Sequence, residues 1–130
     1  MTTPRLICLV LLLGLAACSV PGNPSEGEKI ATTSCRTCHE LDSGGNNTGP
    51  SLQGLFGRKS GTYPDYDYSD AMKNAGVVWT PETLDRYLLG PRTMVPGTKM
   101  SFGSMWDATT RRDVISYLLS INPPSGDGTR

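Results

Sequence analysis

The sequence has little of several kinds of residue, and each shortage narrows the possible functions. Among its 130 residues are one histidine and two phenylalanines, while twelve Lys and Arg residues balance twelve Asp and Glu residues. No basic run or stripe is present, so binding to nucleic acid has no electrostatic basis. No acidic tail is present either, and no apolar run reaches the roughly 20 residues that a membrane-spanning helix needs.

The longest apolar run, Leu6–Ala17, follows a short N-terminus that carries Arg5. Its charge, length and small-residue ending predict a secretory signal peptide over residues 1–17. The end of this segment, Leu15-Ala16-Ala17-Cys18, resembles the lipobox of bacterial lipoproteins, so we expect Cys18 to be lipidated and to become the N-terminus. The alternative is ordinary cleavage at the same point, which would leave a soluble periplasmic protein with a free thiol.

The remainder of the chain is the right length for one small domain. Residues 18–25 are polar and rich in Pro and Gly, which predicts a linker between the lipid anchor and the domain. We expect the domain to occupy residues 26–123 and a flexible tail to follow over residues 124–130. A domain of this size is marginally stable unless a cross-link or a cofactor fastens it.

Start and stop signals predict helices, and no segment alternates convincingly as a strand. The S-x-x-E pattern at Ser25 predicts a capping box for a first helix that runs from Glu26 to the region of Cys38. Thr80 with Pro81, and later Asp107, open two further helices, and a short helix is expected over 69–74. The result is an all-α domain of three to five helices with long loops over 41–61 and 90–105, which something must hold in place.

The pentapeptide Cys35-Arg36-Thr37-Cys38-His39 is the attachment signature of haem c. At 100° per helical residue, the two cysteines and the histidine share one helix face. Both thiols can then form thioethers with the haem vinyl groups while the imidazole reaches the iron. The signature predicts one covalently attached haem c with His39 as an axial ligand.

Three other interpretations of the cysteines are weaker. A redox-active C-x-x-C belongs near a βαβ pattern, which the sequence lacks. A structural zinc site needs four ligands, and this segment supplies three because Cys8 and Cys18 lie at the signal peptide. A disulfide between Cys35 and Cys38 remains possible as a transient before haem insertion.

The sixth ligand of the iron cannot be a second histidine, because His39 is the only one in the chain. A thioether is the natural partner of an imidazole, and it raises the reduction potential relative to a second imidazole. The methionines outside the signal peptide are the candidates, namely Met72, Met94, Met100 and Met105.

The segment Pro96-Gly97-Thr98-Lys99-Met100 resembles the methionine loop of class I cytochromes c, in particular the short-type mitochondrial and bacterial members. The resemblance extends from Gly27 to Leu118 and includes residues 49–52, 54–61, 66–71 and 76–79 in family order. It implies the class I cytochrome c fold, with three to five helices and long loops wrapped around one haem. It also implies a one-electron carrier with no small-molecule substrate and no catalytic residue.

The resemblance further assigns roles to individual residues. Met100 is implied as the distal ligand, and the Pro50 carbonyl as the acceptor of the His39 Nδ1–H bond. Gly27 is implied to let the first helix pack closely on Tyr117. It implies that Arg58, Tyr68 and Trp79 donate hydrogen bonds to the haem propionates. It also implies that Tyr87 faces the Met100 sulfur and that Phe102 covers the haem edge.

The sequence also departs from the family. Ala31 stands where the family usually has an aromatic residue, which we expect to weaken the packing of the terminal helices. Met72 replaces an Asn that usually joins a water network near the methionine, so we expect a drier site. A dense ring of lysines is missing, and electrostatic steering toward an acidic partner should be weak. The lysines present are Lys29, Lys59, Lys73 and Lys99.

These features predict a carrier that faces the periplasm from a membrane anchor. The expected redox partners are a quinol–cytochrome c oxidoreductase, a terminal oxidase or a periplasmic dehydrogenase. Two alternatives stay open on the sequence alone. In the first, the chain is a subunit of one particular dehydrogenase or oxidase complex. In the second, it is a haem enzyme or gas sensor in which the sixth position of the iron is open.

Overall fold

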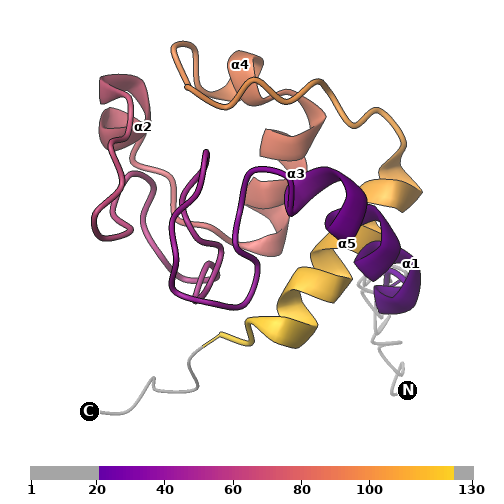
Figure 1. Cartoon of the computed structure of the whole chain (residues 1–130). Helices are drawn as coiled ribbons and strands as arrows, with labels where there is room; N and C mark the ends of the chain where they lie inside the picture. The colour runs from indigo at the N-terminus through magenta and orange to yellow at the C-terminus, as the bar shows by residue number, and fades with distance from the viewer. Residues whose placement is uncertain (1–20, 125–130) are drawn as a thin grey trace, which may run out of the picture.

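The computed structural model describes residues 21–124, so the predicted signal peptide, Cys18 and the tail beyond Pro124 lie outside the described residues. The described chain contains five α-helices and no strand apart from one isolated bridge between Lys59 and Val78 (Figure 1). The predicted all-α fold is therefore confirmed. The helices are α1 (Pro24–Ile30), α2 (Asp70–Asn74), α3 (Pro81–Leu89), α4 (Pro91–Met94) and α5 (Ala108–Ile121). None of them is both long and apolar enough to cross a bilayer.

The two terminal helices, α1 and α5, pack against each other (Figure 1). Gly27 lies at their contact, where a Cβ atom would collide with the Asp113 carbonyl and lie 2.9 Å from the Tyr117 Cβ. Only glycine permits so close an approach of the two backbones. The predicted contact between Gly27 and Tyr117 is confirmed.

Side-chain caps start the other helices where the sequence predicts them. Thr80 accepts a hydrogen bond from the Thr83 amide at 3.2 Å, and Pro81 occupies the first turn of α3. Asp107 accepts from the Thr110 amide at 2.7 Å and caps α5. Ser69 caps α2 in the same way. These starts are local in origin, because the cap satisfies amides of the first turn that have no partner within the helix.

The first helix differs from its prediction. The predicted capping box at Ser25 is wrong: Asn23 caps α1 by accepting from the Ser25 amide at 3.0 Å, and the helix begins at Pro24. The Asn23 main-chain amide also donates to Asp113 of α5 at 2.7 Å, so a contact with the other terminal helix reinforces this start. After Ile30 the chain widens into a π-helical turn, η1 (Ala31–Cys35).

A second difference concerns the segment from Gly90 to Met105, which the sequence predicts as loop. It contains the short helix α4, in which Pro91 takes the first position and the Val95 amide donates to the Pro91 carbonyl at 2.9 Å. Gly90 ends α3 and also precedes α4, so the two helices follow each other around one residue. Proline favours this arrangement because it ends a helix before it and fits the first turn of the next.

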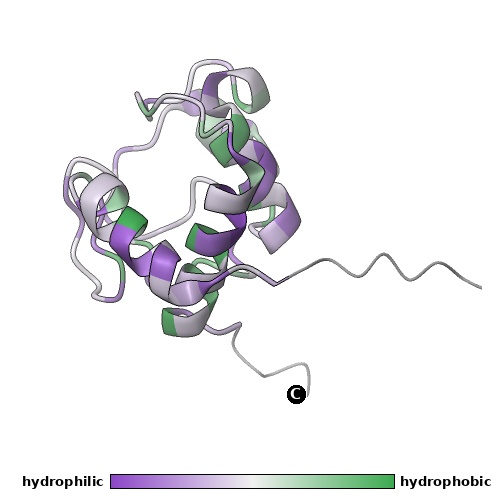
Figure 2. Ribbon diagram, turned by 90° about the vertical axis from the view of Figure 1, so that its right-hand side faces the viewer, coloured by the Kyte–Doolittle hydropathy of each residue, from purple (hydrophilic) through white to green (hydrophobic). Residues whose placement is uncertain are grey.

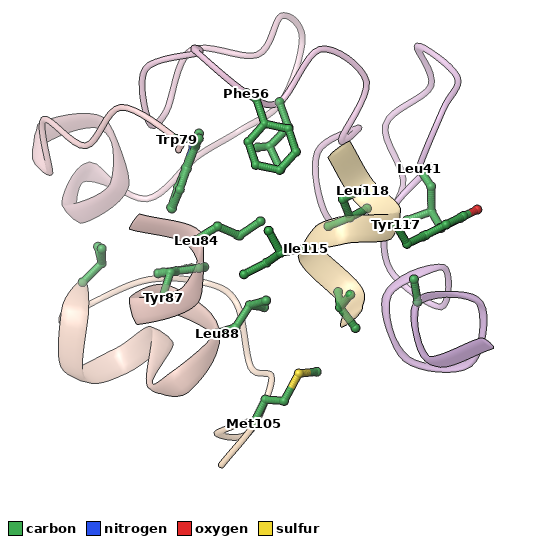
Figure 3. Packing of buried hydrophobic residues seen from close by; sticks show 14 of the residues in the cluster. Leu41, Phe56, Trp79, Leu84, Tyr87, Leu88, Met105, Ile115, Tyr117 and Leu118 are labelled. Atoms are coloured by element: carbon green, nitrogen blue, oxygen red, sulfur yellow. The ribbon is translucent and has the colours of Figure 1, made fainter. Parts of the chain in front are cut away.

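The hydrophobic core lies between α3 and α5. Leu84 and Leu88 of α3 point toward Ile115 and Leu118 of α5, and all four are buried (Figure 3). Figure 2 shows hydrophobic and hydrophilic residues side by side within the same helices. Such helices bury one face and leave the other in water. The core therefore holds α3 and α5 together and leaves their neighbouring loops to form the walls of a site.

Candidate functional site

Residues from several parts of the described chain line a cavity of about 290 Å³. It lies among residues from the first turn after α1, the long loops, α3 and the segment before α5. Every predicted haem-pocket residue within the described chain lines this cavity. The set consists of Cys35, Cys38, His39, Pro50, Arg58, Tyr68, Trp79, Tyr87, Met100 and Phe102.

The C-x-x-C-H segment reaches the cavity from the end of η1. Cys35 closes the π-helical turn, and its carbonyl accepts from the amides of Cys38 at 3.0 Å and His39 at 2.9 Å. The segment is thus a tight turn rather than the regular helix assumed from the sequence, yet all three side chains line the cavity. Burial, and then the nearby Cys38 thiol, raise the pKa of Cys35 to about 11. A redox-active C-x-x-C cysteine has a lowered pKa instead, so this environment argues against that interpretation.

His39 is held by its backbone surroundings. Its Nδ1 lies 2.7 Å from the Pro50 carbonyl, as the resemblance implies. Burial lowers the pKa of the imidazole, and the Pro50 hydrogen bond opposes that shift without cancelling it. A neutral ring that donates from Nδ1 keeps its lone pair on Nε2, which is the form that binds a metal.

Gly49 supports the same imidazole. A Cβ atom at this position would collide with the His39 ring, so only glycine lets the backbone pass so close to it. The Gly49 amide also donates to the Cys38 carbonyl at 2.6 Å. Sequence reasoning placed Gly49 in a family-like segment but assigned it no role.

Arg58 and Tyr68 line another part of the cavity. The Arg58 guanidinium donates to the carbonyls of Gln53 at 2.7 Å and Ser51 at 3.1 Å, and it lies 4.6 Å from the centre of the Tyr63 ring. Burial lowers the pKa of Arg58 and raises the pKa of Tyr68. The main-chain partners of Arg58 orient its side chain, while its implied role toward a propionate stays a prediction.

Tyr87 and Trp79 form an aromatic wall. Their rings meet edge to face with centroids 5.1 Å apart, and both side chains are buried. The Tyr87 hydroxyl lies 2.8 Å from the Thr98 hydroxyl, and the implied position of Tyr87 facing the Met100 sulfur stays a prediction. Thr98 also accepts from the Met100 amide at 3.2 Å. Thr98, which sequence reasoning left without a role, thus connects α3 to the segment that carries Met100.

The structure narrows the methionine candidates. Met72 and Met100 line the cavity, whereas Met94 and Met105 do not. Met105 is buried in the hydrophobic core instead (Figure 3). Met72 is also almost fully buried and belongs to the same core cluster. Met100 is half-buried at the cavity, in the loop that the resemblance identifies.

This set of donors fits a haem c. Two thiols in one turn, one imidazole nitrogen and one thioether sulfur meet around a cavity with mainly apolar walls. Thioether attachment with His and Met axial ligands is the chemistry that such donors support. Across residues 21–124, no cluster of three or more His, Cys, Asp or Glu side chains offers a conventional ion site.

Comparison with known proteins points the same way. Residues 24–122 match the protein family described as Cytochrome c. The chain is 50% identical to the cytochrome c type-1 of Ascaris suum over 97 residues, which are 75% of this chain and 87% of the relative. It is 50% identical to the cytochrome c of Sesamum indicum over 75% of this chain and 89% of that protein. It is also 46% identical to the cytochrome c2 of Rhodopila globiformis over 78% of this chain and 95% of that protein.

Proposed function

Because the chain belongs to the cytochrome c family, we propose that it carries single electrons in a periplasmic, membrane-associated chain, held to the membrane by lipid on Cys18. Family membership itself makes the chain an electron carrier with one covalently attached haem c. The compartment, the anchor and the identities of the ligands are the parts that we propose.

One observation supports the proposed ligands most directly. Cys35, Cys38, His39 and Met100 line the same cavity, although the methionine lies far along the chain from the other three. The two thiols would hold the haem through thioether bonds, and the His39 Nε2 atom and the Met100 sulfur would be the protein ligands of its iron. When bound, the haem supplies an iron centre that gains and loses one electron.

The surrounding residues keep these ligands still. Pro50 fixes the orientation of the His39 ring, and Thr98 fixes the main chain of Met100. Ligands that move little between the two oxidation states keep the cost of electron transfer low. Arg58, Tyr68 and Trp79 provide polar groups that can offset the burial of the propionates. Phe102, half-buried at the cavity, is assigned to the exposed edge through which electrons leave.

The proposed partners are a quinol–cytochrome c oxidoreductase, a terminal oxidase or a periplasmic dehydrogenase. A lipid tether would raise the concentration of the carrier near membrane-bound partners, so strong affinity for them would not be needed. The short linker before α1 suits a domain that stays close to the membrane surface. The relationship to the cytochrome c2 of Rhodopila globiformis supports a bacterial setting.

The anchor is tested by the variant Cys18→Ser in the full chain. We expect the variant to move from the membrane fraction to the soluble periplasm with its visible spectrum unchanged, because the domain does not depend on the lipid. Cys8→Ser is the matched control, since Cys8 lies in the predicted signal peptide and should leave the distribution as in the wild type. A wild-type protein that is already soluble, with an unmodified N-terminus, contradicts the proposed anchor.

A further inference from the structure

Arg111 is a buried arginine of α5 that the haem site does not use directly. Its side chain is 8% exposed, and its Nε donates to Asp85 Oδ1 of α3 at 2.7 Å. Its Nη1 donates to the carbonyls of Met105 at 2.8 Å and Trp106 at 2.9 Å. One guanidinium therefore joins α3, α5 and the segment between Met100 and α5.

The segment after Met100 has few other attachments. Residues 98–107 contain no helix or strand, and their side chains are mostly exposed. The Met105 amide donates to the Leu88 carbonyl of α3 at 2.9 Å. Together with the Arg111 bonds, this contact fixes the chain at Met105 and Trp106, a few residues beyond Met100.

A second ion pair touches the same segment but differs in its surroundings. Lys99 pairs with Asp67 at 2.7 Å, and the two side chains are 50% and 89% exposed. Exposed ion pairs contribute little to stability, because water and salt screen them. In the other pair Arg111 is 8% exposed and Asp85 35% exposed. Removing the partner of a buried charge has a larger effect, because it leaves that charge without compensation. The attachment at Arg111 is therefore the stronger of the two.

We propose that Asp85 and Arg111 are positioning residues for the distal ligand. By clamping Met105 and Trp106 between α3 and α5, the pair keeps the segment over the cavity and Met100 on the iron. This inference rests on the proposed role of Met100. It extends that role, because two residues that do not line the cavity would keep Met100 in place at the sixth position of the iron.

The test is the rate at which added imidazole binds to the ferric, haem-loaded protein. Imidazole can reach the iron only after Met100 leaves, so its rate of binding reports how often the segment opens. We expect Asp85→Ala to raise this rate by about ten-fold or more, which corresponds to a modest loss of clamping free energy. Asp85→Asn keeps the side-chain shape and should give an intermediate rate, and Asp85→Glu should restore most of the wild-type rate.

Asn122→Ala separates clamping from general stability. Asn122 is buried at the other end of α5, where it donates to the Leu41 carbonyl at 2.9 Å and accepts from the Gly54 amide at 3.0 Å. Its replacement should destabilise the fold without changing imidazole binding. Glu82→Gln removes an exposed carboxylate from the same helix as Asp85 and should have no effect.

The outcomes separate the two proposals. If Asp85→Ala binds imidazole at the wild-type rate, or no faster than Asn122→Ala of equal stability, the clamp is overturned and the ligand assignment stands. If the wild type lacks the weak far-red band of a ferric iron–sulfur bond, the assignment of Met100 itself fails. A rate in Asp85→Ala that exceeds both the wild-type rate and the rate in Asn122→Ala, with the band intact in the wild type and in Asn122→Ala, establishes the clamp.

Discussion

The two walls of the haem cavity are built in different ways. On the histidine side, the bonds beside the ligand lie within one segment, residues 38–52: Gly49 donates to the Cys38 carbonyl, Leu52 donates to the Glu40 carbonyl, and His39 bonds to Pro50. On the methionine side, the supports come from other elements, namely α3, α5 and Asp67. Tyr87 holds Thr98, Leu88 and Arg111 hold the chain at Met105, and Asp67 holds Lys99 (the last at the surface).

This difference makes the methionine wall the labile one. Bonds within a short segment survive partial opening of the rest of the molecule, whereas bonds between separate elements break when those elements move apart. The proposed thioethers add covalent attachment to the histidine side alone. We therefore expect the sixth position of the iron to open long before the fifth.

The largest effect is expected on the histidine wall. Cys35→Ala or Cys38→Ala should greatly lower the yield of haem-loaded protein, because each variant removes one of the two thioethers. Haem staining of denaturing gels measures the covalent haem that remains. Haem that acid acetone extracts freely from the wild type contradicts covalent attachment.

A smaller effect, confined to the other wall, is expected for Met100→Ala. The haem should stay attached, the weak far-red band should vanish, and the midpoint potential should fall by on the order of 100 mV or more, because a thioether ligand raises the potential. The reduced protein should also bind carbon monoxide. A redox titration followed by visible spectroscopy measures the changes in the band and in the potential.

Met94→Ala and Met105→Ala are the controls for this experiment, since neither side chain lines the cavity. Both should keep the band and nearly the wild-type potential. Met105→Ala should cost about 2–5 kcal/mol of unfolding free energy, because Met105 is buried in the core. A band that survives Met100→Ala and disappears in one of the controls shows that the loop was wrongly assigned.

The smallest effect is expected from salt. Lys99 on the methionine wall is already paired with Asp67, and the whole chain has a formal net charge of zero. Electron-transfer rates to the native partner should therefore change only weakly with ionic strength, because there is little long-range attraction to screen. Stopped-flow measurements over a range of salt concentrations check this, and a steep fall in rate would reveal a cationic docking face.

The contrast between bonds within one segment and bonds between separate elements also explains what the sequence could predict. The caps at Thr80 and Asp107 act on their own first turns, so a short pattern was enough to find them. The attachment signature was found for the same reason, although its turn is not a regular helix. The start of α1 also has a local signal, Asn23 before Pro24, but the S-x-x-E pattern at Ser25 competes with it, and the contact between Asn23 and Asp113 that favours the earlier start is not local.

The site shows the same limit. A family-like loop identified the segment of Met100, and all ten predicted pocket residues of the described chain line one cavity. Two contacts hold that segment in place: Thr98 bonds to Tyr87, and Asp85 pairs with Arg111. Neither contact has a signal in the sequence. Asp85 and Arg111 are ordinary charged residues in helices, and only the packing of α3 beside α5 brings them together.

The pairing of the two terminal helices also affects the order of events while the chain is being made. Synthesis proceeds from the N-terminus, so Cys35 and Cys38 exist before Tyr117 is present to pack on Gly27. In the unfolded chain, the Cys35 thiol lies in water without the burial that raises its pKa to about 11 in the folded domain. The thiols are therefore most reactive in the open chain, before the pairing of α1 with α5 completes the fold.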